Sequence, residues 1–259
     1  MQTTGHIVLI TGGGSGIGLA LAGALAAKRN TVVIGGRDQA KLKRASTQVP
    51  ALHTTHLDIT DETSVQTALA DITARFGGLS MLVNNAGVAH PYRFGDHPGV
   101  AEHVADEVTT NLLGTLRVTR LALPLLQRQP TAAVVTLSSV LAYAATPNLP
   151  VYAATKAALH SFSRSLRAQL RDTTVKVFDV LPPLVDTHLA APLPGAKLAP
   201  EAVADAVLAG IAADRYELNI ARAKQVARLS RLAPALADRA VQRALQGAAQ
   251  TSPPHPAPR

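Results

Sequence analysis

The sequence predicts an α/β fold in which helices cover both faces of a parallel, doubly wound sheet. Short runs of β-branched and aliphatic residues alternate with stretches of helical periodicity from Ile7 to Leu181. A glycine-rich turn, Thr11 to Gly18, follows the first run and leads directly into a helical stretch. Such alternation is typical of a parallel sheet, because each helix carries the chain back to the edge where the next strand starts. We expect about seven strands in a single domain.

Each predicted strand is a short run rich in β-branched and aliphatic residues. In order, the strands are Ile7–Ile10, Thr31–Ile34, Leu52–His56, Met81–Asn84, Ala133–Leu137, Val175–Leu181 and an edge strand at Tyr216–Ile220. The predicted helices follow the 3.6-residue period, and they span 17–28, 38–48, 61–76, 100–126, 150–171 and 201–213. Two Ala/Arg-rich helices, split at Pro234, finish the fold.

Proline and glycine mark the irregular segments. We expect a loop at His90–Gly99. The segment Pro182–Pro200 holds five of the 17 prolines, and we expect it to lie over the functional site. The last nine residues, Thr251–Arg259, hold four prolines and are expected to be disordered.

The composition restricts the class of protein. Apolar residues make up 47% of the 259 residues and charged residues 16%, which is typical of a globular protein. Cysteine is absent, which excludes disulfides, thiol nucleophiles and thiolate metal sites. No group of histidines and carboxylates has the spacing of a metal site. Neither a signal peptide nor an apolar run of membrane-spanning length occurs, so we expect a cytoplasmic protein.

The formal net charge of +8 is concentrated toward the C-terminus, where residues 215–259 carry eight Arg or Lys against two acidic residues. We expect the helices of residues 221–250 to pack on the domain of residues 1–220 with a solvated basic face. Contact with anionic lipid or an acyl carrier through residues 221–247 is the alternative. Nucleic-acid binding is not expected, because aromatic residues make up only 3% of the chain and no binding motif occurs.

The glycine-rich turn predicts a dinucleotide site. Its glycines follow the pattern T-G-x-x-x-G-x-G. Glycine permits a close approach of backbone to pyrophosphate, and the next helix offers its N-terminal N–H groups. The candidate contacts are Gly12, Gly14, Ser15, Gly16, Ile17 and Gly18. A flexible turn without a ligand is the alternative.

A second pattern predicts acid/base chemistry. Tyr152 and Lys156 follow Ser139 by 13 and 17 residues. Positions i and i+4 of a helix lie on one face, about 5–6 Å apart, so the ammonium is placed beside the phenol. Since a nearby cation favours the phenolate, we expect the pKa of Tyr152 to fall below its usual value of about 10. An incidental surface pair is the alternative.

From Gly5 to Leu189, these features resemble the short-chain dehydrogenase/reductase family. The resemblance rests on Thr11–Gly18, Asn84-Asn85-Ala86-Gly87, Asn111, Ser138-Ser139, Tyr152-x-x-x-Lys156 and Pro182-x-x-Val185-x-Thr187, in this order. The stretches Tyr152–Ser163 and Pro182–Thr187 are also similar to a bacterial branch with an oxidoreductase encoded near teichoic-acid D-alanylation enzymes. The resemblance implies a Rossmann-like fold, NAD(P)-dependent oxidoreductase activity and a homodimer or homotetramer.

The resemblance also implies residue roles. Tyr152 would be the general acid in carbonyl reduction and the base in alcohol oxidation, while Ser139 would hold the substrate oxygen. Lys156 would bind the nicotinamide ribose, and Asn111 would anchor a water that links Lys156 to solvent. Ser138 competes with Ser139, but neighbours in a strand point to opposite faces, so only one can serve and we choose Ser139.

Cofactor selectivity is expected at the end of the second strand. By the resemblance, Gly36 occupies the position of an acidic residue that would bind ribose hydroxyls, and Arg37 follows it. An arginine there accepts a 2′-phosphate, so we expect NADP(H), with NAD(H) as the alternative. Asp38 could equally cap the next helix. Asp58 is a candidate for the adenine amine or a turn cap.

Further contacts follow from the same motifs. The path of the adenosine and phosphates is expected along Asn85, Ala86 and Gly87, and the nicotinamide end at Val185 and Thr187. A bare β-turn also explains Asn85 to Gly87. Pro183 departs from the Pro-Gly that the family commonly has, so local contacts are expected to differ.

The predicted substrate wall is mostly apolar: Val140–Tyr143, Pro150, Val151 and His188. It favours a small or lipophilic carbonyl compound or alcohol. His160 is expected to be a packing or interface histidine, with a second proton shuttle as the alternative. Two other function classes stay open: an NADP(H)-sensing binding protein without turnover, and a peripheral membrane or carrier-docking protein.

Overall fold

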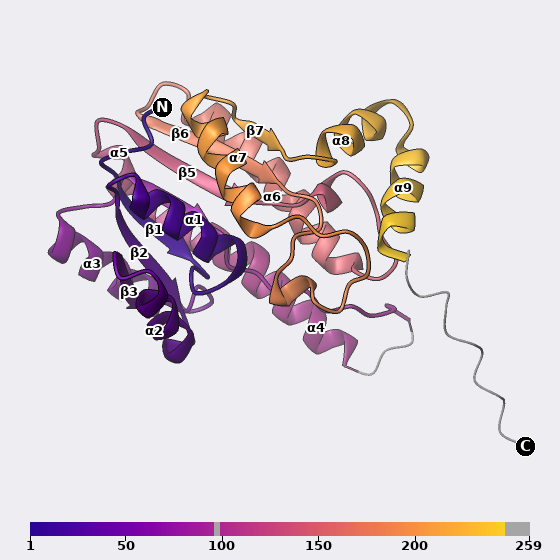
Figure 1. Ribbon diagram of the computed structural model, residues 1–259, viewed down its shortest axis with the longest axis horizontal. Helices are drawn as coiled ribbons and strands as arrows, with labels where there is room; N and C mark the ends of the chain where they lie inside the picture. Colours follow the sequence, from indigo (N-terminus) through magenta and orange to yellow (C-terminus); the bar gives the residue numbers. More distant parts are fainter. Residues whose placement is uncertain (96–98, 247–259) are drawn as a thin grey trace, which may run out of the picture.

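A computed structural model of the protein describes residues 1–95 and 99–246. In this part of the chain, the strands form one parallel sheet in the order β3-β2-β1-β4-β5-β6-β7 (Figure 1). They are β1 (Ile7–Thr11), β2 (Thr31–Gly36), β3 (Leu52–His56), β4 (Met81–Asn84), β5 (Ala132–Leu137), β6 (Val175–Leu181) and β7 (Glu217–Asn219). The predicted α/β class is confirmed. The edge strand β7 is shorter than predicted.

Helices α1 to α7 lie between the strands in sequence and cover both faces of the sheet, and α8 and α9 follow the last strand (Figure 1). They are α1 (Gly16–Ala27), α2 (Gln39–Gln48), α3 (Glu62–Phe76), α4 (Val100–Glu107), α5 (Thr115–Gln127), α6 (Pro150–Gln169), α7 (Pro200–Ala212), α8 (Ala223–Leu232) and α9 (Pro234–Gln246). A π-helical segment, Val108–Gly114, joins α4 to α5, and single 3₁₀ turns lie at Val140–Ala142 and His188–Ala190.

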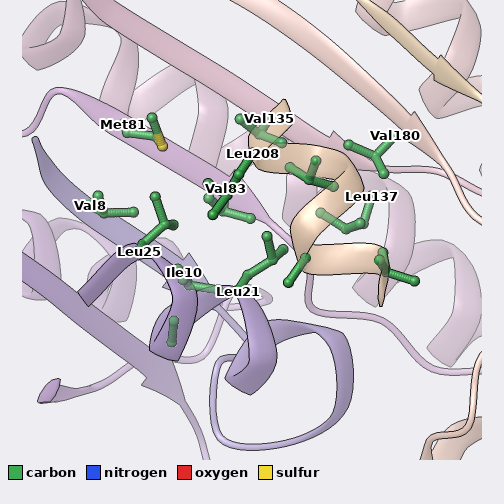
Figure 2. Close-up of a cluster of buried hydrophobic side chains, with 14 of the residues drawn as sticks. Val8, Ile10, Leu21, Leu25, Met81, Val83, Val135, Leu137, Val180 and Leu208 are labelled. Carbon is green, nitrogen blue, oxygen red and sulfur yellow. The ribbon is translucent and has the colours of Figure 1, made fainter. Parts of the chain in front are cut away.

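Alternation along each strand creates two cores. Val8 and Ile10 face α1, α2 and α7, whereas Leu9 faces α3, α5 and α6. Figure 2 shows the first core, where Leu21 and Leu25 of α1 meet Leu208 of α7 over the strands. A strand buried on both faces needs apolar residues at every position, which explains the continuous apolar runs.

The strand order reverses between β1 and β4, because the chain first builds β2 and β3 on one side of β1 and then crosses to the other. The carboxyl ends of parallel strands share one edge, and the reversal opens a crevice there. The glycine-rich turn follows β1 at this edge, so the fold positions it at the topological switch point.

The C-terminal helices α8 and α9 pack at one end of the sheet (Figure 1). The side chains of α9 join what we call the outer apolar group, which comprises Leu141, Ala144, Leu149, Ala153, Ala190, Leu193, Ala237, Val241 and Leu245. Asp238 also accepts a hydrogen bond from the backbone N–H of Ala145 at 2.8 Å. The split at Pro234 agrees with the sequence prediction, and the predicted tail lies outside the described residues. None of the described helices has the length and apolar character needed to cross a membrane.

Candidate active site

The glycine-rich turn packs directly against the segment that follows β4. Gly12 has φ +64°, and a Cβ there would lie 2.9 Å from the Cα of Ala86. The Thr11 hydroxyl accepts hydrogen bonds from the backbone N–H groups of Asn85 and Ala86, both at 3.0 Å. The Asn85 amide donates to the carbonyl oxygens of Thr11 and Gly12 at 3.0 and 3.1 Å. These bonds fix a bare backbone surface at the switch point.

The first turn of α1 continues this surface. Ser15 is the N-cap residue, but its side chain makes no capping bond, and the turn carries no acidic residue. The partial positive charge of the helix N-terminus is therefore not offset locally. Gly16 packs against Thr187, whose Cγ2 would lie 2.9 Å from a Cβ at Gly16. Ile17 is half-buried in the first core.

Arg37 lies exposed directly after β2, at the carboxyl edge of the sheet. Asp38 is the N-cap of α2 and accepts a hydrogen bond from the Lys41 backbone at 2.9 Å, so the structure shows the capping alternative for this residue. The Lys41 side chain packs on Gly14, where an added Cβ would lie 3.1 Å from the lysine Cγ. Lys41 is not among the residues predicted from the sequence, although its position three residues after an N-cap aspartate directs its side chain toward the glycine-rich turn.

Asp58 caps its own turn. Its Oδ1 accepts hydrogen bonds from the Thr60 backbone at 2.8 Å and the Thr60 hydroxyl at 2.7 Å. Burial opposes ionisation of Asp58, but these bonds and the charge of Arg37 outweigh it and hold the pKa below its usual value. The ionised carboxylate and Arg37 thus share the same end of the crevice.

The structure brings Ser139, Tyr152 and Lys156 together at the carboxyl edge of β5. Ser139 is the N-cap of the Val140–Ala142 turn, and its hydroxyl lies beside the phenol of Tyr152 in α6, close enough to lower the pKa of that group. One helical turn further, the Lys156 ammonium donates to the carbonyl oxygen of Leu137 at 2.6 Å. It lies 5.5 Å from the centre of the Tyr152 ring. Pro150 at the start of α6 has a fixed φ that suits the first helical turn.

Burial controls the charge of both groups. It raises the pKa of Tyr152 to about 12, against the opposing effect of the nearby Ser139 hydroxyl, and Glu107 raises it further. Burial also lowers the pKa of Lys156 to about 8, and the charge of Asp179 opposes that fall. The expected fall in the pKa of Tyr152 is therefore wrong for the protein without ligands, because burial outweighs the nearby lysine. In a low-dielectric site, the phenol of Tyr152 and the amine of Lys156 are both more stable in their neutral forms.

The two serines after β5 point to opposite faces, as predicted. The Ser138 hydroxyl donates to Oδ1 of Asp179 at 2.5 Å, inside the sheet. The Ser139 hydroxyl accepts from the Leu141 backbone at 3.1 Å and faces Tyr152. Only Ser139 therefore lies beside the phenol.

Asn111 lies in the π-helical segment and is hydrogen-bonded to the chain that follows β4. Its Oδ1 accepts from the Val88 backbone N–H at 2.8 Å, and its Nδ2 donates to the Val88 carbonyl at 2.9 Å. Gly87 lies between Asn111 and Lys156: a Cβ on it would be 3.1 Å from the Asn111 Oδ1 and 3.8 Å from the Lys156 Nζ. Short π-helical insertions in helices are frequent at functional sites. The water expected between Asn111 and Lys156 stays a prediction.

The segment after β6 lies over the turn, as the prolines suggested. The Pro182 carbonyl accepts a hydrogen bond from Val140 at 3.0 Å, which ties the segment to the Ser139 loop. Val185 is buried and forms a bridge to Leu198. Thr187 and His188 line a cleft between α1 and α7 that also includes Gly16.

The residues of the predicted substrate wall do not all lie in one place. Leu141 belongs to the outer apolar group, and Val140 and the Tyr152 ring pack against that group. Val151 is half-buried on α6. Tyr143 instead donates its hydroxyl to Glu217 of β7 at 2.8 Å. Side chains of α9 also belong to this group, and the sequence did not predict their place near the site.

A buried carboxylate, Glu107, was not predicted. It ends α4, has no exposed surface, and accepts hydrogen bonds from the His90 backbone at 2.8 Å and the Tyr92 hydroxyl at 3.3 Å. Burial raises its pKa. Its position four residues before Asn111, one helical turn away, was the feature of the sequence that could have indicated Glu107 as a site residue. No group of acidic, histidine or cysteine side chains within residues 1–95 and 99–246 is arranged to hold a metal ion.

Comparison with protein families supports a redox site. The family model for short chain dehydrogenases matches residues 6–197. An uncharacterized oxidoreductase of Bacillus subtilis (strain 168), DltE, is 42% identical over 189 residues, which cover 73% of this chain and 75% of that protein. An uncharacterized oxidoreductase of Staphylococcus aureus (strain USA300) is 31% identical over 210 residues, covering 79% and 90%.

Solved structures agree. A short chain dehydrogenase from Burkholderia cenocepacia in complex with NADP superposes with a TM-score of 0.83 at 28% identity, covering 93% of this chain and 99% of that one. A 3-ketoacyl-(acyl-carrier-protein) reductase from Brucella melitensis complexed with NADH has a TM-score of 0.77 at 27% identity, covering 85% and 98%.

Proposed function

This chain belongs to the short-chain dehydrogenase family and is an NAD(P)-dependent oxidoreductase, and we propose that it transfers a hydride between NADP(H) and a lipophilic carbonyl compound or secondary alcohol. In this proposal, Tyr152 is the general acid or base. The observation that carries it is the contact of Ser139 with Tyr152 above a Lys156 anchored to Leu137.

The turn fits a dinucleotide. Positive φ at Gly12, close packing at Gly16 and an uncompensated helix N-terminus suit the approach of a pyrophosphate. When bound, the nicotinamide supplies the hydride or accepts it. Lys156 would then hold the ribose hydroxyls, and Val185 and Thr187 would line the nicotinamide end.

Preference for NADP(H) rests on Arg37. It lies exposed at the end of β2, where Gly36 offers no carboxylate to ribose hydroxyls. Asp38 is engaged in capping α2 and therefore does not replace the missing acid. Lys41 adds a second cation beside Gly14. A 2′-phosphate would meet two cations here.

Tyr152 is suited to donate a proton. A phenol with a pKa of about 12 is fully protonated at neutral pH, so it is ready to protonate the oxygen of a carbonyl during reduction. Ser139 would hold that oxygen, because its hydroxyl already faces the phenol. The Lys156 ammonium would favour the phenolate left behind.

The substrate class follows from the outer apolar group. Leu149 and Leu193 belong to it, and the Tyr152 ring packs against it. Such a wall favours an uncharged, lipophilic compound. We also propose that the protein is cytoplasmic and assembles as a homodimer or homotetramer.

The test is a screen of carbonyl compounds for consumption of NADPH, repeated with Tyr152→Phe. We expect that variant to lose activity by about 10² to 10⁴-fold while it still binds NADPH. Tyr216→Phe is the matched control, since Tyr216 is partly exposed at the edge of the sheet, and it should keep the wild-type rate. Full activity of Tyr152→Phe would remove the proposed acid.

A further inference from the structure

We propose that Asp179 is a positioning residue whose carboxylate, fixed by Ser138 and His160, keeps Lys156 charged and thereby sets the pH at which the Tyr152–Lys156 pair loses its first proton. The proposal rests on the proposed function only for its catalytic consequence. The electrostatic claim concerns the protein alone.

Asp179 is an unusual residue for its place. It lies in β6 with no exposed surface, in a strand whose other residues are mostly apolar. A buried carboxylate is costly unless its oxygens are hydrogen-bonded. Its Oδ1 accepts from the Ser138 hydroxyl at 2.5 Å, and its Oδ2 accepts from Nδ1 of His160 at 2.5 Å. The carboxylate is therefore held on both sides, by β5 and by α6.

The path from Asp179 to the site is short. Leu137, the last residue of β5, and the two serines that follow it have three partners: the Leu137 carbonyl holds Lys156, the Ser138 hydroxyl holds Asp179, and the Ser139 hydroxyl meets Tyr152. Asp179 pairs in register with Thr136, directly before this stretch.

The charges of Asp179 and Lys156 therefore act on each other through the buried end of β5. Lys156 itself is 5% exposed, so water does little to stabilise its charge. The neighbouring carboxylate works against the loss of the lysine proton.

Other charged groups surround Asp179, and they define the control. On α6, Arg167 donates to the carbonyl oxygens of Val177 and Tyr216 and interacts with the charge of Asp179. Tyr143, from the loop after β5, meets the His160 ring edge-on at 5.0 Å.

Glu217 of β7 pairs in register with Asp179, accepts from Tyr143 and lies 3.8 Å from Arg231 of α8. It is thus a second carboxylate one strand further from Lys156, which makes Glu217→Gln a matched control.

The test is a pH titration of the Lys156 side chain by NMR in the protein without cofactor, using ¹³Cε-labelled lysine and Lys156→Arg to assign the signal. In Asp179→Asn, which keeps the shape and removes the charge, the midpoint should fall by about one pH unit. In Glu217→Gln it should stay at the wild-type value. An unchanged midpoint in Asp179→Asn overturns the proposal, as does an equal fall in Glu217→Gln.

Should Asp179→Asn fail to fold, Asp179→Thr supplies a neutral residue suited to a strand, and the same fall is expected. Asp179→Glu should keep the wild-type midpoint of Lys156, because it keeps a carboxylate at this position. This readout needs no substrate, so its failure is distinct from that of the proposed function.

With an active substrate, removal of a negative charge makes the pair lose its proton at lower pH. Both the alkaline limb of reduction and the acidic limb of oxidation should therefore move down together. A purely structural role would lower the rates and leave both limbs in place.

Discussion

The Lys156 ammonium lies 5.5 Å from the centre of the Tyr152 ring, yet the pKa of that phenol is raised to about 12. The cause is that burial acts on both groups and drives each toward its neutral form. A helical i, i+4 spacing brings two side chains together, but it does not determine how much water reaches them. The protein alone therefore holds a protonated tyrosine above a lysine that titrates near pH 8.

The first prediction concerns stability and pH. The pKa of Lys156 falls from 10.5 to about 8 on folding, so the unfolded chain binds more protons between these values, and wild-type stability gains as pH rises through this window. Relative to Lys156→Met, the free energy of unfolding of the wild type should rise by up to about 3 kcal/mol. Urea unfolding at several pH values from 7 to 10 measures it. A constant difference between the two proteins would contradict the lowered pKa.

The second prediction concerns cofactor choice. Arg37→Ala should weaken NADPH binding by about tenfold and leave NADH binding unchanged, because a charge-assisted bond to the 2′-phosphate is lost. Calorimetric titration of both nucleotides measures the effect. Arg75→Ala on α3, an arginine that forms a surface ion pair with Asp71 and packs on the Phe76 ring, should change neither affinity. Equal loss for both nucleotides would remove the phosphate assignment.

The third prediction compares two glycines of α1. A Cβ at Gly18 would lie 2.5 Å from the Asn85 amide and 2.7 Å from the Gly12 carbonyl oxygen, whereas at Gly23 the nearest atom would be 4.0 Å away. Gly18→Ala should therefore lower both stability and NADPH affinity. Gly23→Ala should stabilise the helix by up to about 1 kcal/mol and bind the cofactor normally. Thermal unfolding and NADPH titration of both variants decide this, and similar behaviour of the two would argue against the tight packing of the turn.

The fourth prediction concerns α9. Truncation after Ala233 removes Ala237, Val241 and Leu245 from the outer apolar group. We expect a higher KM for a lipophilic substrate with an unchanged Kd for NADPH, because the cofactor residues lie elsewhere. Truncation after Gln246 is the control and should leave both constants as they are. A lower NADPH affinity in the shorter protein would show that α9 supports the cofactor crevice instead.

Much of the fold could be predicted from the sequence because strands buried on both faces leave a strong pattern. The apolar run from Val8 to Ile10 is an example: consecutive residues serve opposite cores. The shortness of β7 could not be predicted, since its ends depend on pairing with β6 rather than on its own residues. The π-helical segment around Asn111 also leaves no signal in local propensity.

In the candidate site, geometry was easier to predict than electrostatics. Strand alternation separated Ser138 from Ser139 without knowledge of their partners. The bonds of Asp179 could not be predicted, because they join β6 to Ser138 after β5 and to His160 of α6, which are far away in sequence. His160 was expected to be a packing or interface histidine; it does pack edge-on against Tyr143, and its Nδ1 also meets the wholly buried carboxylate of Asp179, which the sequence did not indicate.

The opposed serines also constrain the length of β5. Removing one residue from β5 would shift the register by one residue, and each following side chain would then point to the opposite face. The Ser138 hydroxyl, which now points into the sheet, would face the crevice, and the Ser139 hydroxyl would point away from it. Insertions and deletions upstream in this strand should thus be as damaging as replacing the tyrosine itself, even though they alter no residue that a ligand would touch.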